Sequence, residues 1–149
     1  MVGIGHDESD ERATMPQAVT LIGAEALSDV AQYAYAATAP ANARLVFLAG
    51  SCPLDQDGTI VGIGDYAVQA GRATENMVLA LTAAGARIQD VISTRVLVAS
   101  PDQADLVRAW EVVRDALAEH NVPSTLLGVT VLGYTGQLVE IEAVAAVID

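Results

Sequence analysis

Two glutamates stand inside an otherwise apolar stretch near the carboxyl terminus, where Glu140 and Glu142 alternate with Val139, Ile141 and Ala143. Because successive side chains of a β-strand point to opposite faces, this spacing places both carboxylates on one face of the strand. A carboxylate beside a cleft can hold a water molecule or move a proton. A solvated pair at a sheet edge, or two acceptors of structural hydrogen bonds, is the alternative. Charged residues inside an otherwise apolar strand are unusual, which favours a cleft on this face of the strand.

The residue inventory removes several classes of chemistry. The 149-residue chain has seven arginines and no lysine, which excludes lysine Schiff bases and pyridoxal enzymes. Its one cysteine, Cys52, excludes an intrachain disulfide or a CxxC pair, and we interpret it as a small buried residue rather than a nucleophile. Two histidines, His6 and His120, cannot build a closed His/Cys zinc site. We therefore predict no metal and no cofactor, and a small-molecule substrate handled by carboxylates, hydroxyls and backbone groups.

The formal net charge of −12 bears on partners and location. Nucleic-acid binding rests on Lys and Arg that neutralise phosphates, and anionic membrane surfaces attract the same residues, so neither partner is expected. No apolar run reaches the length of a membrane span, and residues 1–16 lack the apolar stretch of a secretory signal. We interpret residues 1–16 as a flexible polar leader and residues 17–149 as a single domain, and expect the protein in the cytoplasm.

The elements that must position these residues follow the order β-β-β-α-β-α-β-β. The predicted strands cover residues 18–22, 33–38, 45–49, 91–98, 126–132 and 138–148. Apolar residues at steps of three and four predict two helices, the first capped by Asp65 and ended by Gly85. Residues 133–136 are predicted to join the last two strands as a short antiparallel hairpin.

This order predicts an α+β fold with two helices packed on one face of a mixed sheet. The chain has no further elements to cover the opposite face. We therefore expect neighbouring copies of the chain to bury that face in an oligomer.

Four segments resemble the reactive intermediate deaminase (Rid, YjgF-type) superfamily in order and spacing. They read LVFLAGSCPLDQDG at 45–58, QAGRATENMVLALTAAGA at 69–86, DVISTRVLV at 90–98 and VEIEAVA at 139–145. The resemblance extends from about residue 33 to the end of the chain. It implies a chorismate-mutase-like fold, assembled as a homotrimer with three equivalent clefts between subunits. Rid enzymes hydrolyse reactive imines and enamines to a ketone or keto acid plus ammonia, without metal or cofactor.

The resemblance also implies site residues. Glu140 matches the family carboxylate that positions or activates water from across the interface, and the substrate-binding positions are Tyr35, Gly50, Ser51, Thr125, Leu126 and Leu127. Tyr35 matches a tyrosine that borders the pocket, and Gly50 stands where backbone must approach a ligand closely. Backbone groups of residues 126 and 127 are expected to face the substrate. Ordinary strand and turn roles are the alternatives for Tyr35, Gly50 and Ser51.

The chain departs from the deaminating subfamily at two positions. The Pro-x-Arg motif that binds the substrate carboxylate reads Pro123-Ser124-Thr125, so a hydroxyl replaces the guanidinium. A charge-assisted hydrogen bond contributes about 1.5–3 kcal/mol against about 1 kcal/mol for a neutral one, which disfavours small anionic imines by about tenfold or more. Val107 replaces an asparagine that many relatives carry in the pocket. Arg95 is expected to pair with an acidic neighbour rather than supply the missing charge.

Two functions are compatible with these residues. The first is a cofactor-free imine or enamine hydrolase, or a related enzyme, acting on a neutral reactive intermediate with Glu140 as the acid-base group. The second is a non-catalytic small-molecule-binding trimer that has lost deaminase activity, which Thr125 and Val107 favour. The ribonuclease or translation-inhibitor activity ascribed to some relatives is disfavoured, since three copies at −12 each carry −36.

Overall fold

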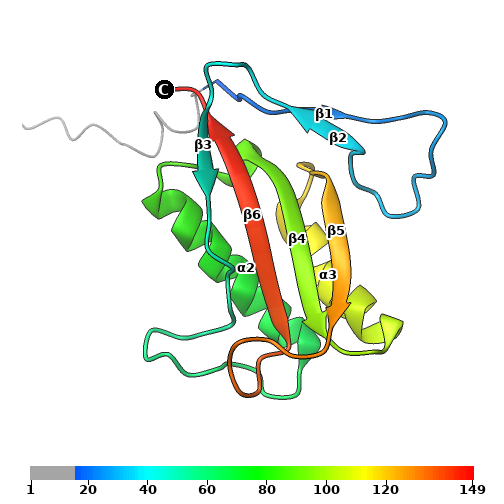
Figure 1. The fold of residues 1–149 in the computed structure, drawn as a ribbon, viewed down its shortest axis with the longest axis vertical. Helices are drawn as coiled ribbons and strands as arrows, with labels where there is room; N and C mark the ends of the chain where they lie inside the picture. The colour runs from blue at the N-terminus through cyan, green and yellow to red at the C-terminus, as the bar shows by residue number, and fades with distance from the viewer. Residues whose placement is uncertain (1–15) are drawn as a thin grey trace, which may run out of the picture.

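The computed structural model describes residues 16–149, and its main sheet has both long helices on one face (Figure 1). The strands are β1 (Thr20–Ile22), β2 (Ala36–Thr38), β3 (Arg44–Phe47), β4 (Val91–Ala99), β5 (Ser124–Val129) and β6 (Val139–Val147). The helices are α2 (Tyr66–Ala83), α3 (Gln103–Leu117) and the short 3₁₀ helix η1 (Ile88–Asp90). The predicted α+β class, with two helices on one face of a mixed sheet, is confirmed. The predicted leader lies outside the described residues except for Pro16.

Four strands form the main sheet in the order β3-β6-β4-β5. β6 runs antiparallel to both β3 and β4, whereas β4 and β5 are parallel and joined by α3. Parallel neighbours require such a crossover because a tight turn can only reverse the chain. β1 and β2 pair with each other in a separate two-stranded sheet beside one end of the main sheet (Figure 1).

The predicted hairpin between the last two strands is wrong. β4 lies between β5 and β6, so the two strands are not neighbours. Residues 130–138 connect them, which is longer than the roughly two to five residues of a hairpin loop. The connection passes the end of β4 before β6 begins (Figure 1). Adjacency in sequence was a poor guide here because the α3 crossover had already brought β5 to the free edge of β4.

The helix boundaries have local causes. Asp65 caps α2, because its Oδ1 accepts a hydrogen bond from the backbone N–H of Val68 at 3.0 Å. Gly85 follows the helix with a φ of +76°, a conformation that glycine adopts readily. Both predicted boundaries are confirmed. The apolar stripe of α2 is fully buried and includes Ala73 and Met77, and its small side chains let the helix pack closely on the sheet.

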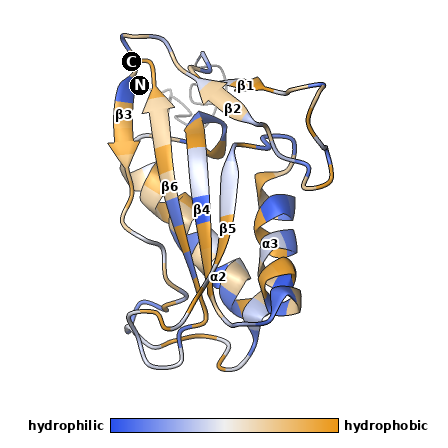
Figure 2. Ribbon diagram, turned by 45° about the vertical axis from the view of Figure 1, so that its right-hand side comes forward, coloured by the Kyte–Doolittle hydropathy of each residue, from blue (hydrophilic) through white to orange (hydrophobic). Residues whose placement is uncertain are grey.

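The opposite face of the sheet is not covered by either helix of the described residues (Figure 1). Large apolar side chains are exposed on it: Phe47 at 74%, Leu45 at 54% and Leu127 at 36%. Apolar residues make up most of β3 and the last part of β6 (Figure 2). We call this surface the open face. Within residues 16–149, no helix has the length and hydropathy needed to cross a membrane.

Candidate functional site

The carboxylate of Glu140 packs against the backbone of Gly50. A Cβ placed on residue 50 would lie 2.7 Å from Glu140 Cδ and 2.9 Å from Oε2, closer than side-chain carbons approach in proteins. Gly50 therefore has a specific steric reason to be glycine. The segment is held to β6 by two backbone hydrogen bonds, from Ser51 N to Ile141 O at 2.7 Å and from Ile141 N to Ser51 O at 3.0 Å. Gly50, Ser51 and Glu140 thus lie together within one chain, whereas the family resemblance implied that Glu140 acts from across the subunit interface.

Two side chains donate hydrogen bonds to one oxygen of this carboxylate. Cys52 Sγ lies 3.0 Å from Glu140 Oε1, and Gln137 Nε2 lies 3.4 Å from the same oxygen. Gln137 is buried and is itself fixed, because it also donates to Val139 O and accepts from the N–H of Tyr134. Within the described chain, Oε2 receives no hydrogen bond. The carboxylate is held through one oxygen while the other stays available.

The Cys52 thiol has an unusual environment for a free cysteine. Burial, the hydrogen bond to Glu140 and the charge of Glu140 together raise its pKa to about 11. At neutral pH it is a protonated thiol, which disfavours a nucleophilic role and fits a hydrogen-bond donor. Cys52 was expected to be a small buried residue, but its side chain is only partly buried and its thiol contacts Glu140. Sequence reasoning missed both Cys52 and Gln137.

Glu142 points to the same face as Glu140 but has a different partner. Arg95 holds it with two hydrogen bonds, Nε to Oε2 at 2.8 Å and Nη2 to Oε1 at 3.2 Å. The hydrogen bond from Arg95 is the main cause that lowers the pKa of Glu142. The expected ion pair of Arg95 is confirmed. Among residues 16–149, Glu140 makes no ion pair with Arg or His.

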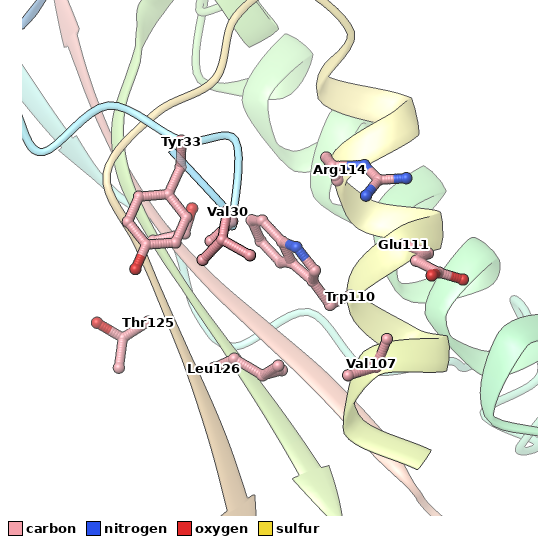
Figure 3. A pocket seen from close by; sticks show the side chains of 10 residues that line it. Val30, Tyr33, Val107, Trp110, Glu111, Arg114, Thr125 and Leu126 are labelled. Carbon is pink, nitrogen blue, oxygen red and sulfur yellow. The ribbon is translucent and has the colours of Figure 1, made fainter. Parts of the chain in front are cut away.

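A pocket of about 670 Å³ lies at the start of β5, between that strand, α3 and the segment that leads to β2 (Figure 3). Its lining includes Val30, Tyr33, Val107, Trp110, Thr125 and Leu126. The rings of Tyr33 and Trp110 meet edge to face, with centroids 6.1 Å apart. Glu111 and Arg114 are on the rim, and Figure 3 shows their charged groups turned away from Val30 and Tyr33. The interior is therefore mainly apolar, with the Thr125 hydroxyl at one side.

The predicted substrate-binding residues fall in separate places. Thr125 and Leu126 line the pocket, whereas Leu127 lies on the open face. Tyr35 does not line it: its hydroxyl donates to the carbonyl of Ser28, and its ring contacts Tyr33 at a centroid distance of 5.8 Å. Glu140 does not line the pocket: it is on β6, two strands from β5, and shares the face of Leu127, because both residues are register partners of Leu97 on β4.

The structure also bears on metal binding. Within residues 16–149, no three side chains of His, Cys, Asp or Glu gather closely enough to hold a metal ion.

Comparison with known proteins identifies the family. Residues 23–147 match the family described as Endoribonuclease L-PSP, so the chain belongs to this family. A solved structure from Mycobacterium tuberculosis, Rv2704 of the highly conserved YjgF/YER057c/UK114 family, is 30% identical over 87% of this chain and 99% of its own, with a TM-score of 0.58. The predicted membership in the Rid (YjgF-type) superfamily is confirmed. No curated protein matches the chain.

More distant structures share the fold. YyfB from Yersinia pestis, of the conserved Rid protein family, is 24% identical with a TM-score of 0.78, covering 87% of this chain and 98% of its own. RidA from an Antarctic Psychrobacter bacterium is 23% identical with a TM-score of 0.62, covering 89% and 99%. These similarities concern the arrangement of helices and strands.

Proposed function

We propose that this protein is a cofactor-free hydrolase that deaminates neutral or bulky reactive imines and enamines in a cleft between subunits of a homotrimer. The observation that carries the proposal is the Glu140 carboxylate, whose Oε1 is held by two donors while Oε2 is free of hydrogen bonds from the described chain. A carboxylate fixed in this way can orient water and move protons. The alternative of a solvated edge residue does not account for the close fit to Gly50.

The reaction needs only proton transfers around one water molecule. Glu140 Oε2 takes a proton from water as the water oxygen bonds to the imine carbon, and the C=N electron pair moves to nitrogen, which receives that proton. The resulting carbinolamine then loses its hydroxyl proton to the carboxylate. The same proton is delivered to the amine, the C–N bond breaks, and ammonia leaves as the carbonyl forms. An enamine enters this scheme as its imine tautomer.

The open face supports association of the chain with other copies, and the family resemblance implies that the assembly is a homotrimer. Exposed Phe47, Leu45 and Leu127 make this sheet surface apolar, and such a surface is stabilised by burial against another protein surface. Sister chains are the partners that the family resemblance implies. Assembly would also place the Glu140 cluster of one subunit opposite the pocket of another, which a single chain keeps apart.

The positions and partners of the nearby arginines support the preference for neutral or bulky substrates. Thr125 offers the pocket a hydroxyl but no charge. Arg95 on the neighbouring strand is committed to Glu142, and Arg114 on the rim pairs with Asp115 at 3.1 Å. The apolar walls formed by Trp110 and its neighbours suit a hydrocarbon or aromatic group. A small imine that carries a carboxylate would find no unpaired arginine in this pocket to bind its charge.

The test generates imines in situ from neutral, aromatic and acidic amino acids or amines with an amine-oxidising enzyme and follows their loss against semicarbazide trapping. We expect wild type to accelerate hydrolysis of bulky imines and Glu140→Gln to lose about 100-fold or more of that rate. Glu142→Gln is the matched control, because it changes the same residue type on the same face of β6. Equal rates for wild type and Glu140→Ala on every imine would rule the proposal out.

A second candidate is a non-catalytic binding protein, which the apolar Val107 and the uncharged Thr125 favour, since both remove polar contacts from the pocket. Binding of a bulky neutral ligand would then change the fluorescence of Trp110, the single tryptophan of the chain, without any turnover. RNA is not proposed as a substrate, because the net charge of −12 opposes phosphate binding.

The location of the protein in the cytoplasm stays a prediction.

A further inference from the structure

We infer that Cys52 is a positioning residue for Glu140: its thiol donates to Oε1 and, together with Gln137, turns Oε2 toward the reacting water. The catalytic consequence rests on the proposed function. The contact itself joins residues 88 positions apart in the chain, at a distance of 3.0 Å between Sγ and Oε1. The Glu140 side chain on β6 is thus held by a residue outside β6.

The direction of the hydrogen bond is determined by charge. A thiolate at 3.0 Å from a carboxylate would place two negative charges in contact, which strongly disfavours that state. Burial and the neighbouring carboxylate raise the pKa of Cys52 to about 11, so the thiol keeps its proton through the neutral range. The thiol is the donor and the carboxylate the acceptor. The reactivity of the Cys52 thiol therefore reports on the charge of Glu140.

Cys52 is itself held firmly, which a positioning residue requires. Asn76 on α2 donates from Nδ2 to two carbonyl oxygens of this segment, Cys52 O at 2.8 Å and Leu54 O at 2.9 Å. The preceding residue, Ser51, is paired with β6 through the backbone. Helix α2 and strand β6 thus fix the backbone on both sides of the thiol, and the thiol fixes the carboxylate.

Glu140 has little freedom to move away from this donor. The backbone of Gly50 lies on one side of its carboxylate. Gln137, which is buried with 4% of its surface exposed, lies on another side. Gln137 alone is a weak anchor, because its Nε2 lies 3.4 Å from Oε1, longer than an ordinary N–H···O hydrogen bond. Removal of the thiol should therefore let the carboxylate rotate, whereas a serine at the same position retains a donor.

The first experiment does not depend on turnover. The chain has one cysteine, so the initial rate of alkylation by iodoacetamide, measured between about pH 7 and pH 9.5, reports only on the Cys52 thiolate. Glu140→Gln should react about three- to tenfold faster than wild type, because removal of the neighbouring charge lowers the thiol pKa. Glu142→Gln should react at the wild-type rate. Equal alkylation rates in wild type and Glu140→Gln overturn the inference.

The second experiment uses imine hydrolysis. Cys52→Ala should lower kcat about tenfold with little change in KM, because the carboxylate loses the donor that orients it. Cys52→Ser should restore kcat, because the serine hydroxyl is again a donor at this position. If Glu140 proves necessary for turnover but Cys52→Ala keeps the wild-type kcat, the inference fails and the proposed function stands. If wild type hydrolyses no imine while the alkylation rates differ as expected, the contact is upheld and the proposed function fails.

Discussion

Arg95 and Thr125 are register partners on β4 and β5, yet the Arg95 guanidinium turns to Glu142 on the other side of β4. A cation therefore stands one strand away from the position where the deaminating subfamily is expected to carry its arginine. The two hydrogen bonds to Glu142 engage the Arg95 guanidinium. This arrangement keeps the neighbourhood of Thr125 close to neutral.

Restoring a charge at this position should change the choice of substrate. We expect Thr125→Arg to raise kcat/KM for small carboxylate-bearing imines by about 10- to 100-fold, because it adds a charge-assisted hydrogen bond. Bulky neutral imines should gain nothing, since the new side chain takes up space in the pocket. The measurement is the semicarbazide competition assay on both substrate classes. Thr125→Val controls for loss of the hydroxyl, and wild-type turnover of small anionic imines as fast as Thr125→Arg would refute this argument.

The fit between Gly50 and Glu140 makes a steric prediction. Gly50→Ala should abolish most Glu140-dependent turnover and cost about 1–3 kcal/mol of folding stability, because the added Cβ overlaps the carboxylate. Gly23→Ala is the matched control, since a Cβ there meets no atom within 4 Å. Urea unfolding and imine hydrolysis measure the two effects. Wild-type behaviour of Gly50→Ala would mean that the carboxylate does not occupy this place.

The open face predicts the oligomeric state. Wild type should have three times the 15.4 kDa chain mass in light scattering, and Phe47→Asp should reduce it to one chain. A carboxylate buried against an apolar surface has no counter-charge and no hydrogen-bond donor there, and burial of such an unpaired charge costs several kcal/mol. Leu79→Asp tests the same substitution type at a residue that is 66% exposed on α2, and its mass should stay that of wild type. A wild-type mass of one chain would contradict the homotrimer.

The raised pKa of Cys52 predicts how stability depends on pH. A group with a folded-state pKa above its unfolded value stabilises the protein fully below the unfolded pKa, here 9.0 for a free thiol, and loses this contribution as pH rises toward about 11. Wild type should therefore lose more stability than Cys52→Ala between about pH 8.5 and pH 10.5 in urea unfolding. Parallel pH curves for the two proteins would show that Cys52 has an ordinary pKa.

Local patterns were enough for much of the fold. The alternation around Glu140 predicted that Glu140 and Glu142 lie on the same face of the strand. The helix ends at Asp65 and Gly85 follow from local hydrogen bonds and backbone conformation. These features depend on neighbours in the chain. Sequence reasoning therefore reached the class of the fold, and the role of Glu140 stays a prediction.

Long-range partners were the part that sequence could not predict. The two glutamates look alike in the chain, but Arg95, 47 residues away, pairs with one, and Cys52, 88 residues away, contacts the other. The hairpin prediction failed for a similar reason, because the neighbour of β5 is chosen by the α3 crossover rather than by the next strand in sequence. One amino-acid sequence by itself carries no signal for such long-range pairings.

The segment between β1 and β2 supplies Val30 and Tyr33 to the pocket, while Glu140 stands on the central sheet. Connecting segments tolerate insertion and substitution far better than packed strands do. Evolution could therefore remodel the pocket wall for new molecules without disturbing the acid, and a protein engineer could diversify residues 23–35 by the same route.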